Sequence, residues 1–277
     1  MKKTGTPVIA TMVMIVLVLV SFVGCIGFWQ DQLIFFPDTI DEDEDLSWTG
    51  ASEEIFVDVE DGARIHGLFF DSQGPSTGVV LYFHGNAGSV ASWYRTALKL
   101  TEYDVDVFLI DYRTYGKSTG DLSEQGLYLD GKAAYNYLIE RGYAPDSIVV
   151  HGRSLGSAIA SSVAAEYPVG ALILETPFVS LMGLVEELYP FLMPRRLLRY
   201  ELDNHGRVAD IDAPTWVVHG TDDEVIPLSH GRRVFEALPN GWKMTVIEHG
   251  RHNNLMSFER YGEDASLFFQ TVLPAVD

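Results

Sequence analysis

A serine lies between two glycines in the run Gly152-Arg153-Ser154-Leu155-Gly156, which follows mostly apolar residues and precedes small, helix-compatible ones. Gly-x-Ser-x-Gly between a strand and a helix is typical of a nucleophile elbow, where a tight turn exposes the serine hydroxyl. Glycine is needed on both sides because a side chain there would collide with the neighbouring strand or helix. The motif predicts nucleophilic catalysis by Ser154; its structural alternative is an ordinary strand-to-helix turn.

A serine nucleophile needs an acid and a histidine base, which follow it in that order in enzymes with such an elbow. Two later strand-like runs each end in a turn rich in these residue types. The pattern alone does not choose among the acids and histidines there, and turns rich in Asp and Gly are also common for structural reasons. The candidates are Asp222, Asp223 and Glu224 in the first turn, and His249 and His252 in the second.

The oxyanion that forms during acyl transfer needs two hydrogen-bond donors, and the loss of one costs roughly 10² to 10³ in rate. The glycine-rich run His84-Gly85-Asn86-Ala87-Gly88 follows an apolar strand-like stretch and can direct backbone amides into a site. We expect the amide of Leu155 as the first donor and that of Asn86 as the second. This chemistry requires no metal ion and no organic cofactor.

These residues need a scaffold, and the pattern of the chain predicts one. Two alternating runs on either side of Asp61-Gly62 predict an antiparallel hairpin at the start of the fold. After it, short apolar runs alternate with helix-length segments, which indicates a mostly parallel sheet covered by helices on both faces. In such sheets function gathers at the carboxyl ends of the strands. The expected strands are residues 78–83, 105–110, 148–150, 171–174, 216–218 and 244–247, and the expected helices are 91–101, 125–140, 155–166 and 230–238.

The strings HGNAG, DYRTYGKSTG, HGRSLGSAIA, GTDDEVIP and HNN resemble the α/β-hydrolase superfamily, in particular its small-capped, membrane-anchored abhydrolase-domain serine hydrolases. The resemblance covers roughly residues 27–272. It implies a catalytic domain over residues 54–277, with a small helical cap at about 179–212. It also implies a triad of Ser154, Asp223 and His252, with Asp222 and His249 as second choices.

Two positions depart from the family pattern. Thr114 stands where the family has glycine, so a backbone conformation that is easy for glycine must suit threonine there. Ser157 replaces a more usual glycine after the elbow, a small-for-small change that still permits close packing of the helix. The first departure concerns the shape of one loop and leaves the triad intact.

The amino terminus predicts attachment to a membrane. Lys2 and Lys3 precede an uncharged run from Pro7 to Trp29, whose roughly 23 residues cover about 34 Å as a helix, enough to cross a bilayer. Positive charge before this segment and acidic residues after it predict a cytoplasmic amino terminus and an extracytoplasmic catalytic domain, periplasmic in a bacterium. Alternatively, the sequence before Cys25 resembles a lipoprotein signal in which Cys25 becomes lipidated. Residues 1–29 are therefore an anchor or a lipoprotein signal.

The formal net charge is −20, and such a surface repels phosphate backbones, so we expect no nucleic-acid partner. Residues 30–53 contain the acidic run Asp41-Glu42-Asp43-Glu44-Asp45, which we interpret as a solvated linker. The run lacks the spaced ligands and glycine of a calcium loop. The sequence does not indicate an oligomeric state.

The predicted cap is rich in large apolar residues and ends in a cluster of Arg195, Arg196 and Arg199. We expect it to accept an acyl or other apolar group near a membrane, with the arginines facing an anionic group. In the alternative, the cap packs on its own domain and its arginines pair with acids. The sequence thus predicts a membrane-tethered serine hydrolase of esters, thioesters or amides. The alternatives are a peptidase of the serine-aminopeptidase type and a binding protein on a hydrolase fold.

Overall fold

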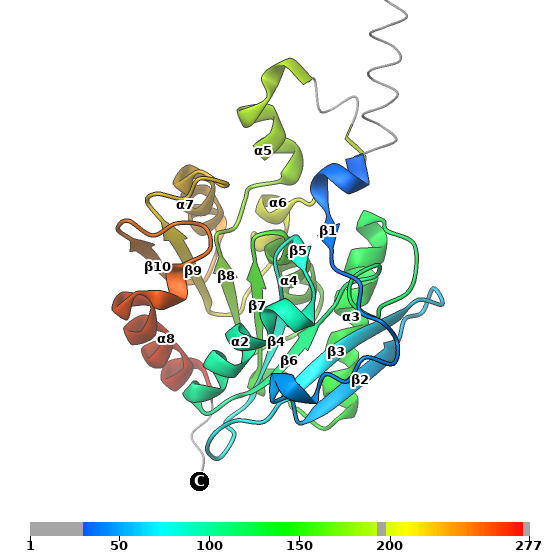
Figure 1. Ribbon diagram of the computed structural model, residues 1–277. Coiled ribbons are helices and arrows are strands. Elements are labelled where there is room, and N and C mark those ends of the chain that lie inside the picture. Colours follow the sequence, from blue (N-terminus) through cyan, green and yellow to red (C-terminus); the bar gives the residue numbers. More distant parts are fainter. Residues whose placement is uncertain (1–29, 193–197, 274–277) are drawn as a thin grey trace, which may run out of the picture.

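An eight-stranded, mostly parallel sheet forms the centre of the protein in the computed structural model, which describes residues 30–192 and 198–273 (Figure 1). Its strand order is β10-β9-β8-β7-β4-β6-β3-β2, and only β3 pairs antiparallel with its neighbours. The predicted α/β-hydrolase fold is confirmed. The strands are β2 (Glu53–Asp58), β3 (Arg64–Phe70), β4 (Val79–Phe83), β6 (Asp106–Ile110), β7 (Ile148–Arg153), β8 (Ala171–Glu175), β9 (Thr215–Gly220) and β10 (Gly241–Ile247).

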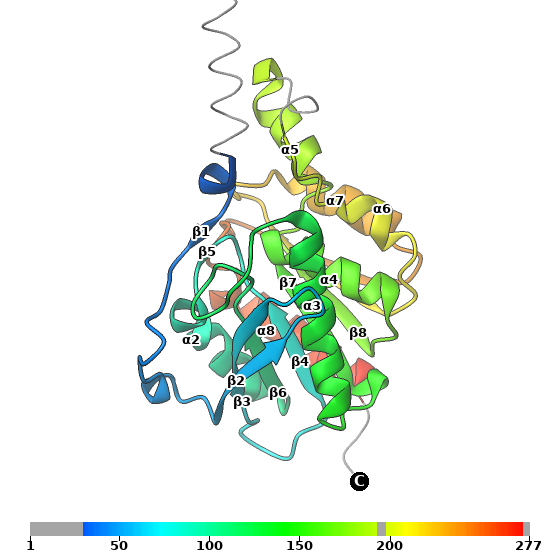
Figure 2. The same ribbon diagram turned by 90° about the vertical axis from the view of Figure 1, so that its right-hand side faces the viewer.

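Helices cover both faces of this sheet (Figures 1 and 2), which explains why the central strands are buried along their whole length. Helices α2 and α8 pack on one face, and α3, α4, α6 and α7 pack on the other. Helix α8 buries Tyr261, Ala265, Phe268 and Phe269, the spacing of an amphipathic helix. The helices are α2 (Val90–Leu100), α3 (Glu124–Glu140), α4 (Leu155–Glu166), α5 (Leu181–Leu188), α6 (Asn204–Val208), α7 (Leu228–Ala237) and α8 (Glu259–Val272).

The predicted hairpin is present as β2 and β3, which pair antiparallel with Phe56 opposite His66. Gly62 has a φ of +91° in the turn between them, a conformation that glycine adopts without strain. Thr114 has a φ of +71°, so the glycine-like conformation expected at this departure from the family pattern is retained by threonine. Threonine holds this left-handed conformation at the cost of local strain.

The chain before β2 packs against the body on both sides of an exposed acidic run at residues 41–45. Phe35 and Leu46 are buried, and the short strand β1 (Phe36–Pro37) pairs in parallel with β5 (Ala87–Gly88). Short 3-10 turns complete the described chain. They are η1 (Ser47–Thr49), η2 (Thr101–Tyr103), η3 (Pro145–Ser147), η4 (Pro190–Leu192) and η6 (Leu255–Ser257).

The segment between β8 and β9 contains α5, η4 and α6, in the region where a cap is predicted. Helix α6 packs against α4 and α7, whereas α5 projects from the body in both views (Figures 1 and 2). His230 on α7 contacts this segment at two points: its Nε2 lies 3.1 Å from Glu187 in the last turn of α5, and its Nδ1 accepts a hydrogen bond from the amide of Val179, which precedes α5. This segment is thereby joined to the body by a buried histidine.

Candidate active site

Ser154 occupies a sharp turn between β7 and α4, with φ 52° and ψ −116°. A Cβ on Gly156 would lie 2.1 Å from the carbonyl oxygen of Phe83, and one on Gly152 would lie 2.3 Å from that of Gly156. Only glycine fits at both positions, because these neighbours are backbone atoms that cannot move aside. The predicted elbow geometry is therefore present, and it holds the serine in a conformation that is unusual for an L-residue.

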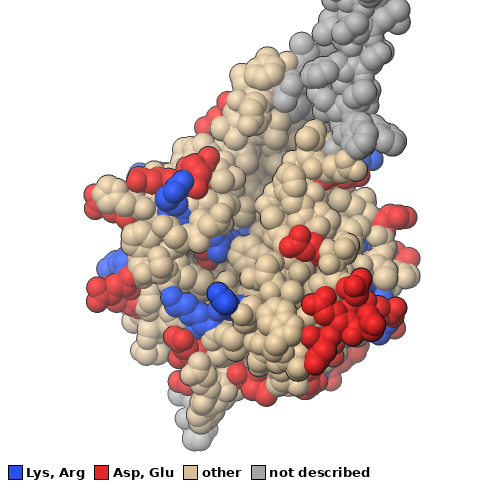
Figure 3. Space-filling model, viewed as in Figure 1, with Lys and Arg blue, Asp and Glu red and all other residues tan. Residues whose placement is uncertain are grey.

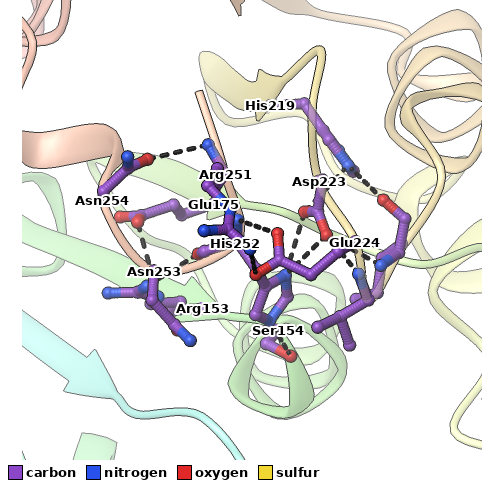
Figure 4. Close-up of polar contacts among 12 residues, drawn as sticks. Arg153, Ser154, Glu175, His219, Asp223, Glu224, Arg251, His252, Asn253 and Asn254 are labelled. Atoms are coloured by element: carbon purple, nitrogen blue, oxygen red, sulfur yellow. Dashed lines mark hydrogen bonds and ion pairs between the residues drawn. The ribbon is translucent and has the colours of Figure 1, made fainter. Parts of the chain in front are cut away.

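The structure brings Ser154, His252 and Asp223 together at the carboxyl ends of the strands (Figure 4). Nε2 of His252 lies 3.1 Å from Oγ of Ser154. Nδ1 of the same ring lies 2.9 and 3.0 Å from the two carboxylate oxygens of Asp223. Because a carboxylate only accepts, Nδ1 carries the proton and Nε2 is left to accept the serine proton.

Asp223 is fixed and kept ionised by its neighbours. Its Oδ1 accepts hydrogen bonds from the amides of Val225 and Ile226 at 2.9 and 2.8 Å. Its Oδ2 lies 3.3 Å from Nε2 of the buried His219. Burial disfavours the charged form, but hydrogen bonds from His219 and His252 outweigh it and hold the pKa of Asp223 far below its ordinary value. The acid is therefore ionised beside the imidazole at neutral pH.

Both predicted oxyanion donors lie next to the serine. Leu155 is the first residue of α4, where a backbone N–H has no partner within the helix. A Cβ built on Gly85 would lie 3.9 Å from Cβ of Ser154, which places the residue before Asn86 beside the nucleophile. The assignment of these two amides as donors remains a prediction that their position supports.

A buried ion pair behind the serine was not predicted from the sequence. Arg153 donates from Nη2 to the carbonyl oxygen of His252 at 2.7 Å and to Oδ1 of Asn253 at 2.9 Å. Its Nε lies 3.4 Å from the fully buried Glu175 at the end of β8. Burial raises the pKa of Glu175, but the charge of Arg153 and the contact with His151 outweigh it and lower that pKa. Arg153 therefore ties the elbow to the loop that carries His252.

The second-choice residues form a separate pair. His249 and Asp222 lie 3.3 Å apart at the surface, with their side chains largely exposed, and no contact recorded for the described residues joins either to Ser154. Cys25, Arg195 and Arg196 lie outside the described residues. Arg199 is paired with Asp31 at 2.8 Å, as expected if the cap arginines pair with acids. His219 could have been suspected from sequence, because it stands four residues before the acid at a strand end.

No helix among residues 30–192 and 198–273 is long and apolar enough to cross a membrane. The predicted anchor over residues 1–29 lies outside these ranges.

Comparison with known proteins identifies the family. The family described as the alpha/beta hydrolase fold matches residues 78–197. An uncharacterized protein of Mycobacterium tuberculosis is 32% identical over 252 residues, which cover 90% of this chain and 88% of that protein. Alpha/beta hydrolase domain-containing protein 17C of Xenopus tropicalis is 30% identical over 223 residues, 78% of this chain and 69% of that protein. The solved structure of Pyrococcus furiosus esterase Pf2001 has a TM-score of 0.68 at 18% identity and covers 87% of this chain and 98% of that one. The chain belongs to the α/β-hydrolase superfamily.

Proposed function

We propose that this protein is a serine hydrolase that cleaves carboxylic esters through an acyl-enzyme on Ser154. The observation that carries the proposal is the continuous chain of contacts from Oγ of Ser154 through the imidazole of His252 to the ionised Asp223. Each of these side chains is nearly excluded from solvent, with Ser154 8% and His252 6% exposed. In such surroundings the interaction between imidazolium and carboxylate is stronger than in water.

In the proposed reaction, Oγ of Ser154 attacks the substrate carbonyl carbon while Nε2 of His252 takes the hydroxyl proton. The carbonyl oxygen becomes an oxyanion that accepts hydrogen bonds from the amides of Leu155 and Asn86. Collapse of this intermediate breaks the bond to the leaving group, which takes the proton from His252. A water molecule then repeats the sequence on the acyl-enzyme, releasing the acid and restoring Ser154.

We favour an ester substrate because two proteins with the same fold are esterases, the Pyrococcus furiosus esterase and an acetyl xylan esterase of Paenibacillus. Thioesters and amides use the same apparatus. A substrate panel decides among them. Purified protein is assayed against matched ester, thioester and aminoacyl amide substrates; we expect the largest kcat/KM for esters, and a preference for aminoacyl amides would instead identify a peptidase.

The role of Ser154 is tested by Ser154→Ala, with Ser229→Ala as a matched change at an exposed serine on α7. Removal of the nucleophile should lower kcat by about 10⁶ and abolish labelling by a fluorophosphonate probe. Ser229→Ala should retain both hydrolysis and labelling by the probe. Unchanged hydrolysis in Ser154→Ala, or a folded wild-type protein that no serine probe labels, would reject the serine mechanism and favour a binding role for the fold.

We further propose that residues 1–29 tether the enzyme to a membrane, with the catalytic domain on the extracytoplasmic side. Leu188, Tyr189 and Phe191 are exposed at the outer end of the α5–η4 projection, Phe191 by 75%. This projection rises from the end of the molecule at which the described chain begins, drawn in dark blue (Figures 1 and 2). It carries few charged side chains, whereas acidic side chains gather lower on the same face (Figure 3). An exposed apolar end beside the segment that follows the proposed anchor is suited to contact with lipid.

The substitution Cys25→Ser in the full chain tests whether the protein is tethered to a membrane, and it distinguishes a transmembrane anchor from a lipid anchor. A transmembrane anchor predicts that both proteins stay in the membrane fraction after alkaline carbonate extraction. A lipid anchor predicts loss of the lipid mass and release of the variant into the soluble fraction. Recovery of the wild-type protein in the soluble fraction would contradict either form of tether. Protease accessibility in intact cells and spheroplasts reports the orientation of the catalytic domain.

A further inference from the structure

The segment that leads from residue 29 into the body, residues 30–38, which we name the N-terminal strap, is bound directly to the loop that carries Asn86. The Phe36 amide donates to the carbonyl oxygen of Asn86 at 2.9 Å, and the Asp38 amide donates to that of Gly88 at 2.9 Å. Nδ2 of Asn86 donates in return to the carbonyl oxygen of Ile34 at 2.9 Å. The strap and the loop are therefore joined from both sides.

These contacts fix the peptide groups around the expected oxyanion donor. The carbonyl of Asn86 accepts a second hydrogen bond, from the Tyr115 hydroxyl at 2.8 Å. The carbonyl of Gly85 lies 2.6 Å from Nδ1 of His84. Because the Gly85-Asn86 peptide is planar and trans, holding that carbonyl also fixes the direction of the Asn86 N–H. The side chain, the carbonyl and the preceding peptide of Asn86 are each held.

The other end of the strap binds the segment that returns from the cap. Oδ1 of Asp31 accepts hydrogen bonds from the Tyr200 hydroxyl at 2.7 Å and from Nη2 of Arg199 at 2.8 Å. The rings of Phe35 and Tyr200 meet edge to face at 4.9 Å, and both are buried. The strap thus lies between the cap and the oxyanion loop and contacts both.

We infer that the N-terminal strap is a positioning element for the oxyanion hole. It holds Asn86 so that its amide is oriented before substrate binds, and it connects that amide to the cap. Preorganised donors stabilise the transition state because no energy is spent on orienting them during the reaction. The inference rests on the proposed role of Ser154 and adds that the residues following the anchor sequence support catalysis as well as tether the protein.

The test uses Phe36, whose side chain is 50% exposed and lies outside the catalytic machinery. Phe36→Pro removes the N–H that binds the Asn86 carbonyl, and Phe36→Ala keeps that N–H while removing the ring. We expect Phe36→Pro in the full chain to lower kcat by about 10- to 100-fold, part of the cost of losing one oxyanion donor. KM should stay within about twofold, and Phe36→Ala should match the wild type in both parameters, as a change away from the reacting atoms.

A second measurement distinguishes positioning from general damage. A trifluoromethyl ketone forms an adduct with the serine that carries an oxyanion, whereas the corresponding alcohol forms none. In Phe36→Pro the inhibition constant of the ketone should rise in proportion to the loss of kcat, and that of the alcohol should not change. Equal weakening of both, or wild-type kcat in Phe36→Pro, overturns the inference.

If Phe36→Pro does not fold, Asn86→Ala is used to test the inference, because it keeps the backbone amide and removes only the hydrogen bond to Ile34. The measurement is again the inhibition constant of the ketone relative to that of the alcohol. The proposed function fails separately, if Ser154→Ala remains active. An inactive Ser154→Ala together with an unaffected strap variant refutes the strap inference alone.

Discussion

Replacing Asp223 by asparagine should move the ring proton of His252 from Nδ1 to Nε2. Oδ1 of Asp223 accepts two backbone amides, from Val225 and Ile226, so the carbonyl oxygen of asparagine must take this place. Its NH₂ group then occupies the position of Oδ2, 2.9 Å from Nδ1 of His252. A donor there favours the tautomer in which Nδ1 accepts and Nε2 carries the ring proton, because an Nδ1 proton would keep only the oxygen at 3.0 Å as a partner. In that tautomer Nε2 cannot take the serine proton.

The expected loss in kcat is about 10⁴, or about 5.5 kcal/mol of transition-state stabilisation, the size known for this change in other Ser-His-Asp enzymes. The assay is hydrolysis of a p-nitrophenyl ester, with fluorophosphonate labelling as a second readout. Thermal unfolding shows whether the variant is folded. Substrate affinity should change little, because Asp223 does not contact the substrate in the proposed reaction.

Asp222→Asn is the matched control, since Asp222 is adjacent in sequence but exposed and paired with His249. We expect it to keep kcat within about twofold, as surface changes away from the reacting atoms usually do. The reasoning is refuted if Asp223→Asn keeps more than about a tenth of wild-type kcat, or if Asp222→Asn loses more of its kcat than Asp223→Asn does.

Three further changes test the support of the site. Gly156→Ala would place a Cβ 2.1 Å from the Phe83 carbonyl oxygen, so we expect a folded but inactive elbow or a loss of about 1–3 kcal/mol in the free energy of unfolding, measured by urea titration. Arg153→Gln would leave the buried Glu175 without its counter-charge, and the free energy of unfolding should fall by about 3–5 kcal/mol; a fall below about 1 kcal/mol would show that the ion pair is not structural. Burial lowers the pKa of His230, so below about pH 6.5 the unfolded chain binds the proton more readily than the folded protein, and the free energy of unfolding decreases as the pH is lowered. In His230→Gln this free energy should decrease less between about pH 7.5 and pH 5, and identical slopes for the two proteins would contradict the assignment.

The sequence predicted the parts of the site that depend on strand ends. Ser154, Asp223 and His252 each follow an apolar run, and parallel strands bring their carboxyl ends to one edge. Periodicity could not choose Asp223 over Asp222, because both stand in the same turn; the family resemblance supplied that choice. In the structure the choice depends on the direction of the side chains, with Asp223 turned inward to the amide of Ile226 and Asp222 turned outward.

The N-terminal strap could not be predicted in this way. Strand β1 is only Phe36–Pro37, and its pairing with the oxyanion loop uses backbone groups that every residue possesses. The Arg153–Glu175 pair was missed for a related reason. Its members become neighbours only through the register of β7 and β8, and neither position carries a pattern that marks a buried charge.

The distance along the chain between Ser154 and its base also affects how activity arises during folding. The contact between Ser154 and His252 spans 98 residues, and that between His252 and Asp223 spans 29. Contacts of such long range form only after the entropy of closing the intervening chain has been overcome. The base reaches the serine when β9 has docked beside β8 and β10 beside β9. Recovery of hydrolysis during refolding therefore reports the docking of the carboxyl-terminal strands, and it should lag behind the signals of sheet formation around β4 and β7.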